Sequence, residues 1–222
     1  MQTAACSAVV RSQADSRKSQ ESGAHGASPL FLPGASKLFD SQPNIEVLRK
    51  IISGGQTGAD RAGLDFAIEA GLEHGGYVPR GRKAEDGRID DRYRLVELPS
   101  GAYPARTKRN VAEGDGTVIF SLENELAGGS ELTLSYAIRV GKPAVQISNA
   151  ETQGAKEAFF KQVLRLRHFI EENGIKVLNV AGSRESEEPG VYAFTLRMLR
   201  QYWEDRSAPD GMREYFRSKD LV

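Results

Sequence analysis

A glycine-rich segment at residues 54–58 has the residue types of an anion-binding loop. It follows an apolar run and precedes a helical pattern, and it offers Gly54, Gly55, Gln56, Thr57, Gly58 and the following Asp60 to a ligand. Glycines let a ligand approach the backbone, and the free N–H groups at a helix N-terminus favour a phosphate or another oxyanion. We therefore expect Gly55→Val to abolish binding. Neither GK[ST] nor GxGxxG is present, so this is not a nucleotide-hydrolysing P-loop. The alternative is a turn that only joins a strand to a helix.

Two further segments repeat this order of strand, glycine turn and helix. One offers Gly128, Gly129, Ser130 and Thr133, and the other offers Gly182, Ser183 and Arg184. The hydroxyls could bind an anion or cap a helix, and Arg184 adds a charged donor. In a doubly wound sheet, all three turns emerge at the carboxyl ends of strands, where ligands bind. The sequence therefore predicts one crevice built from three loops.

A charged segment lies between the first two loops and is expected near the same edge of the sheet. It offers Arg80, Arg82, Lys83, Glu85 and Asp86, of which the basic residues could close over an anion and the acidic ones could position a hydroxyl or a cation. The alternative is a solvated surface loop. Further along, Thr107 and Asn110 are three residues apart and so share one face of a predicted helix.

The elements that position these residues alternate between strands and helices. This alternation is typical of an α/β fold in which helices flank a mostly parallel central sheet, and we expect a Rossmann-like three-layer fold. Strands are expected at 47–53, 76–79, 94–98, 117–121, 144–148 and 176–181. Helices are expected at 59–70, 104–112, 131–140, 156–173 and 191–203. Gly71, Gly141 and Gly174 stand where three of these helices should stop.

Composition divides the chain into three parts. Residues 1–43 are rich in Ser, Ala, Gln and Gly without apolar periodicity, which predicts a disordered N-terminal tail. The alternative is an organelle transit peptide, although Asp15, Glu21 and Asp40 make the segment more acidic than such peptides usually are. Residues 44–205 form the predicted ligand-binding domain, and 206–222 form a charged C-terminal extension.

Charge and cysteine content exclude several classes of protein. Thirty basic residues balance 30 acidic ones, so no bulk attraction to nucleic acid or to an anionic membrane is expected. The single cysteine, Cys6, cannot form an internal disulfide, and no zinc-binding pattern is present. Without a long apolar run or a secretory signal, we expect a cytoplasmic protein. The helix at 156–173 has more apolar residues than one stripe requires, which predicts a homo-oligomer.

The motifs taken together resemble a known family. The segments IISGGQTGADRAGLD, GGYVPRGRKAEDG, YPARTKRNV, GDGTVIFS, LAGGSELT and VAGSRESEEPGVY are similar to the putative molybdenum carrier family, in the circularly permuted YpsA branch of the Rossmann-like SLOG superfamily of nucleotide-ligand binders. The resemblance spans residues 47 to about 203. It implies an often oligomeric protein that holds an anionic ligand in its glycine loops, with the molybdenum cofactor (molybdopterin) or molybdate as cargo and a nucleotide-type ligand as the alternative.

An enzymatic function is the main competing interpretation. A related phosphoribohydrolase group has the motif PGGxGTxxE, but here the proline is absent and Ser135 stands in place of the glutamate. We therefore expect a carrier or binding protein rather than an enzyme. A hydrolase or transferase acting on a nucleotide-derived substrate stays an alternative, with Asp60, Asp86 or Glu131 as acid or base, as does a nucleotide-ligand sensor.

Overall fold

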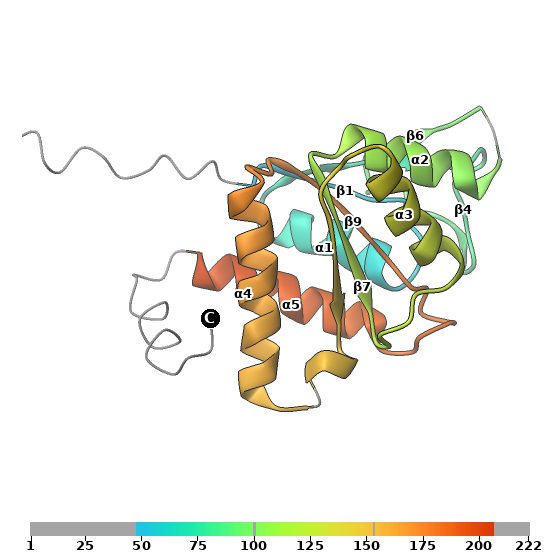
Figure 1. Cartoon of the computed structure of the whole chain (residues 1–222). Helices are drawn as coiled ribbons and strands as arrows, with labels where there is room; N and C mark the ends of the chain where they lie inside the picture. The colour runs from blue at the N-terminus through green and yellow to red at the C-terminus, as the bar shows by residue number, and fades with distance from the viewer. Residues whose placement is uncertain (1–47, 100, 153, 207–222) are drawn as a thin grey trace, which may run out of the picture. The chain divides into compact units, whose positions relative to one another are not determined.

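A parallel sheet of five strands forms the centre of the domain that the structure describes. The structure, a computed structural model, describes residues 48–99, 101–152 and 154–206 (Figure 1). The strands stand in the order β2-β1-β9-β7-β8, with bounds Glu73–Gly75, Lys50–Ile52, Val177–Gly182, Gly116–Ser121 and Ala144–Ser148. β7 is buried along its whole length and β9 is buried in its middle, which agrees with the apolar residues that predominate in both strands.

Helices cover both faces of this sheet. Their bounds are α1 Ala59–Glu69, α2 Tyr103–Glu113, α3 Gly128–Arg139, α4 Lys156–Glu172 and α5 Val191–Asp205, with a short 3-10 helix at Ala150–Thr152. Side chains alternate between the faces of a strand. Val180 packs into the core shared with α1, α4 and α5, whereas its neighbour Asn179 faces residues of α2 and α3. The Rossmann-like three-layer fold predicted from the sequence is confirmed.

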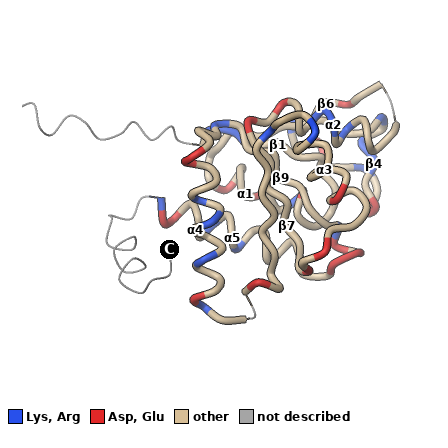
Figure 2. The backbone as a smooth tube through the Cα atoms, viewed as in Figure 1, with Lys and Arg blue, Asp and Glu red and all other residues tan. Residues whose placement is uncertain are grey.

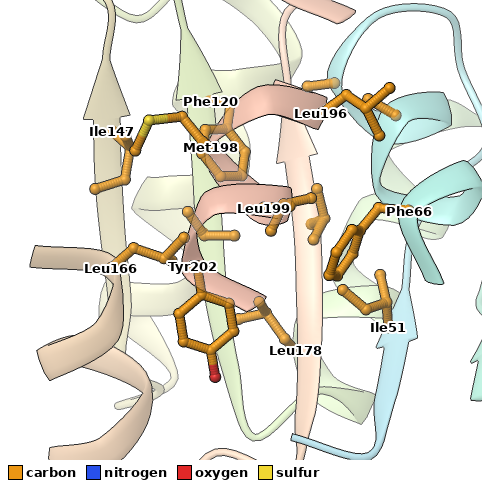
Figure 3. Close-up of a cluster of buried hydrophobic side chains, with 14 of the residues drawn as sticks. Ile51, Phe66, Phe120, Ile147, Leu166, Leu178, Leu196, Met198, Leu199 and Tyr202 are labelled. Carbon is orange, nitrogen blue, oxygen red and sulfur yellow. The ribbon is translucent and has the colours of Figure 1, made fainter. Parts of the chain in front are cut away.

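The larger hydrophobic core lies between the sheet and the α1, α4 and α5 layer. Phe66, Phe120, Leu166 and Leu199 belong to one cluster there (Figure 3). Phe120 also meets Phe194 edge to face, with ring centroids 6.2 Å apart. This packing explains much of the apolar surplus in the helix predicted at 156–173, because five of its apolar side chains are buried within this chain. These five are Phe159, Val163, Leu164, Leu166 and Ile170.

Two of the expected strands form outside the main sheet. β3 (Tyr77–Val78) and β6 (Val96–Glu97) pair with each other in a separate two-stranded parallel sheet, next to a short hairpin of β4 (Lys83–Ala84) and β5 (Gly87–Arg88). One edge of the main sheet is instead β2, whose sequence Glu-His-Gly has no apolar run that would have indicated a strand. A second, smaller core supports this region, formed by Leu64, Val78, Ile89, Tyr93 and Leu95.

The ends of the chain carry several expectations that the structure does not reach. The predicted tail at 1–43 and the predicted extension at 206–222, apart from Arg206, lie outside the described residues. Within the described part, basic and acidic residues are interspersed along the chain (Figure 2). No helix of that part is long and apolar enough to cross a membrane. The glycines at the expected helix stops, Gly71, Gly141 and Gly174, all have a positive φ, as C-terminal stops require.

Candidate functional site

A cavity of about 270 Å³ opens at the carboxyl ends of β1, β7 and β9. The first turns of α1, α2 and α3 and the loop after β9 form its wall. Its lining residues are Gln56, Asp60, Tyr103, Pro104, Arg106, Thr107, Gly128, Gly129, Ser130, Leu132, Thr133, Ala181, Gly182, Arg184 and Glu187. Three helix N-termini and two arginines therefore surround one hollow.

The N-terminus of α3 faces the cavity without a cap from a side chain. Its N-cap residue is Ala127, which has no side-chain oxygen, and the hydroxyl of Thr133 donates to the carbonyl of Gly129 at 2.7 Å instead of capping the helix. A Cβ atom built on Gly128 or Gly129 would meet no heavy atom within 4 Å, so this turn borders open space. The first N–H groups of a helix and its dipole favour an anion at such a position.

Arg106 brings a positive charge to the floor of the cavity. It extends from the first turn of α2, and its Nη1 donates to the carbonyl of Gly54 at 3.2 Å and lies 3.4 Å from Oδ2 of Asp60. The side chain is only 14% exposed. Its Nε is buried and has no hydrogen-bond partner in the described part of the chain, and the same is true of Nε2 of Gln56 beside it. Two residues that line the cavity thus have buried N–H donors without hydrogen-bond acceptors among the described residues.

Arg184 brings a second guanidinium to the mouth of the cavity. It follows β9, and its contact with Glu187 is long, with 3.9 Å between Nε and Oε1. The guanidinium carbons of Arg184 and Arg106 lie 5.4 and 5.7 Å from the ring centroid of Tyr103. One aromatic ring therefore contacts both cations, within the distance at which cation–π attraction operates.

Asp60 is the buried acid of the site. It lies in the first turn of α1, is 4% exposed and accepts a hydrogen bond from the backbone N–H of Gln56 at 3.3 Å. Burial raises the pKa of Asp60 above its ordinary value, and the nearby Arg106 only partly offsets this effect. A carboxyl group with a raised pKa at a cavity is a potential proton donor.

Several glycines of the three loops serve the packing of the backbone. Gly55 has φ +72°, and a Cβ there would lie 2.9 Å from Leu95 and 3.0 Å from Ile89, in the smaller core. A Cβ on Gly58 would collide with the carbonyl of Ser183, and one on Gly182 with the carbonyl of Phe120. Gly55 and Gly58 therefore allow close packing and do not line the cavity, whereas Gly182 packs closely and also lines it.

The charged segment after β3 is mostly used to build the fold. The guanidinium of Arg82 is buried and donates to the carbonyls of Ile89, Asp90, Tyr93 and Leu95 at 2.7–3.1 Å. Asp86 pairs with Arg61 at 3.2 Å, and the side chains of Arg80 and Lys83 are exposed. The carboxylate of Glu85 accepts from Thr57 and Ser186.

The structure brings together nine of the residues expected from the sequence. These are Gln56, Asp60, Thr107, Gly128, Gly129, Ser130, Thr133, Gly182 and Arg184. Gly54 and Asn110 line a much smaller adjoining hollow. There the side-chain amide of Asn110 accepts a hydrogen bond from the backbone N–H of Tyr77 at 2.8 Å and donates one to the Tyr77 carbonyl at 3.1 Å. The others lie outside the cavity lining: Gly55, Thr57, Gly58, Arg80, Arg82, Lys83, Glu85, Asp86 and Ser183.

Sequence reasoning missed six lining residues: Tyr103, Pro104, Arg106, Leu132, Ala181 and Glu187. Arg106 had a usable signal, because it lies in the first turn of a helix that leads into a central strand, close to the Pro104 that marks the start of that helix. Other basic residues lie close by in the sequence, and nothing in the sequence distinguished Arg106 from them. Tyr103 had no comparable signal.

The strand order explains how the last strand of the chain comes to lie at the centre of the site. If β9 and α5 are moved to the front of the chain, the order β2-β1-β9-β7-β8 becomes 3-2-1-4-5, as in a Rossmann fold. The switch point between β9 and β7 then coincides with the cavity. A family model described as the circularly permutated YpsA SLOG family matches residues 51–203. The chain belongs to this family.

A solved structure supports the same relationship. The crystal structure of a putative molybdenum carrier protein from Syntrophus aciditrophicus SB is similar to this member of the family, with 41% sequence identity and a TM-score of 0.65. The match covers 70% of this chain and 94% of that one. A search of the curated proteins finds no match.

Proposed function

We propose that this protein binds a phosphate-bearing or oxyanion ligand in the cavity at the carboxyl edge of its sheet and acts as a carrier for it. One observation carries the proposal: the uncapped N-terminus of α3 borders the same hollow as Arg106 and Arg184. A helix N-terminus and two guanidiniums are the groups that proteins use for phosphate-like anions.

The cargo that we propose is the molybdenum cofactor (molybdopterin) or molybdate, as the name of the Syntrophus relative suggests for that protein. The residues present fit the anionic part of such a cargo, because Arg106 Nε and Gln56 Nε2 are buried donors that lack acceptors. Tyr103 and Leu132 add apolar surface to the same cavity, which suits a ligand with a ring as well as an anion.

A second candidate function rests on Asp60. A hydrolase or transferase acting on a nucleotide-derived substrate requires an acid or base at the bound ligand, and Asp60 is a cavity residue whose pKa is raised by burial. The other acids considered for this role, Asp86 and Glu131, lie outside the cavity lining. A nucleotide-ligand sensor would use the same anion contacts without any reaction.

Mass spectrometry and metal analysis of the natively purified protein distinguish these functions. A copurified pterin with molybdenum supports the cofactor carrier, molybdenum without a pterin supports a molybdate carrier, and a nucleotide supports the alternatives. The matched variant is Arg106→Ala, which should lose the copurified molecule, whereas Arg197→Ala on α5, outside the cavity lining, should retain it. Equal retention by both variants would contradict the proposed site.

A further inference from the structure

The carboxylate of Glu85 joins two of the three glycine loops. Oε1 accepts hydrogen bonds from the hydroxyl of Thr57, in the loop after β1, and from the backbone N–H of Ser186, in the loop after β9. Oε2 accepts from the hydroxyl of Ser186. Both oxygens are thus used, and they join two loops that are far apart in the sequence.

The backbone of Glu85 adds a third attachment. Its N–H donates to Oε1 of Gln56 at 3.1 Å, which fixes the side chain of a cavity-lining residue. Thr57 Oγ1 in turn accepts from the backbone N–H of Glu185 at 3.3 Å. Glu85 therefore contacts the loop that carries Gln56 and, through Ser186, the loop that carries Arg184, although Glu85 itself lies outside the cavity lining.

We propose that Glu85 is a positioning residue for ligand binding: its bridge between Thr57 and Ser186 holds the loops after β1 and β9 in the arrangement that places Gln56 and Arg184 around the ligand. The proposal rests on the proposed function of the cavity. Ordering these loops before binding removes a conformational cost that the ligand would otherwise have to offset. Loss of the bridge then weakens binding without removing any ligand contact.

A carboxylate suits this position better than an amide. Partial desolvation opposes ionisation of Glu85, but the hydrogen bonds from Ser186 and Thr57 outweigh it and lower the pKa of this group. Hydrogen bonds to an ionised acceptor are stronger than those to a neutral one. Glutamine keeps one acceptor oxygen in place and should preserve part of the bridge.

The experiment compares the full-length wild type with Glu85→Ala, Glu85→Gln and Arg88→Ala. Arg88 lies on the same β4–β5 hairpin and pairs only with the exposed Asp91 among the described residues, at 2.8 Å, so its variant controls for a surface change in this hairpin. Two quantities are measured: amide hydrogen exchange in segments 56–60 and 183–188, and the affinity for inorganic phosphate by calorimetry. Thermal unfolding verifies that each variant is folded.

We expect Glu85→Ala to exchange faster in both segments, by about fivefold or more, and to bind phosphate about threefold to tenfold more weakly. Glu85→Gln should lie between it and the wild type, and Arg88→Ala should match the wild type. A folded Glu85→Ala variant with unchanged exchange in both segments would overturn the proposal, as would unchanged phosphate affinity. If wild type binds no phosphate, the proposed function loses support. The exchange rates alone then test whether Glu85 orders the loops after β1 and β9.

Discussion

The guanidinium of Arg106 lies directly against the backbone of Gly54. Its Nη1 donates to the Gly54 carbonyl at 3.2 Å, and a Cβ built on Gly54 would be 2.5 Å from the guanidinium carbon. A glycine in the loop after β1 is therefore required by an arginine that arrives from α2, 52 residues later. This contact places the cation at the floor of the cavity.

Gly54→Ala should displace Arg106 and leave the fold intact. The backbone of Gly54 has no positive φ, and the atoms in the way belong to the end of a flexible side chain, so the melting temperature should change little. Phosphate affinity should fall about threefold to tenfold, because Arg106 leaves its position. Calorimetry checks this, with the exposed Gly101→Ala as control, since a Cβ there meets nothing within 4 Å. Unchanged affinity for Gly54→Ala would show that the position of Arg106 is unimportant for the anion.

Gly55→Val should act on stability. Its φ of +72° disfavours a β-branched side chain, and Leu95 and Ile89 already occupy the space. The free energy of unfolding should fall by about 1–3 kcal/mol or more, as measured by urea denaturation. The glycine pattern alone had suggested a direct effect on the ligand. A Gly55→Val variant as stable as wild type would contradict the packing account.

Arg82→Lys should destabilise the segment after β3. Lysine cannot reproduce the planar set of donors that serves four carbonyls, so some of these carbonyls would be left without a partner. We expect a loss of about 3 kcal/mol in the free energy of unfolding, with Arg80→Lys, an exposed neighbour, as the neutral control. Equal stability of the two variants would refute a structural role for Arg82.

Asp60→Asn should change the pH dependence of stability. Because burial raises the pKa of Asp60, the folded state binds more protons than the unfolded state between the ordinary pKa of about 3.9 and the raised value. The free energy of unfolding of wild type should therefore fall, relative to Asp60→Asn, as pH rises from about 4 through the raised pKa, and then level off. Urea titrations over this range measure the difference. A relative gain in wild-type stability would mean that Arg106 dominates and lowers the pKa.

Parallel strands made the location of the site predictable from the sequence. Turns such as 54–58 and 182–184 each follow a strand, and strands that run in one direction must present these turns at one edge. The order of the strands was not predictable, because nothing local in 176–181 shows that the last strand lies between β1 and β7. The same limit applies to β2, whose short polar sequence pairs only because β1 offers it an edge.

Individual roles within the site were harder to predict, because they depend on contacts between distant segments. Arg82 and Arg106 are both basic residues close to glycine loops, yet one is enclosed by carbonyls and the other borders the cavity. Asn110 lies inside a helix, where its intrinsic preference is poor, and this indicated a polar partner. The structure shows that this partner is the backbone of Tyr77.

Anomalous diffraction from crystals grown with molybdate locates the bound anion, because molybdenum scatters anomalously above its absorption edge. We expect a peak in the cavity between the N-terminus of α3 and the guanidiniums of Arg106 and Arg184, and no such peak in crystals of an Arg106→Ala, Arg184→Ala double variant. A strong peak elsewhere in the wild-type protein with the cavity empty, or an undiminished cavity peak in the double variant, would contradict the proposed site.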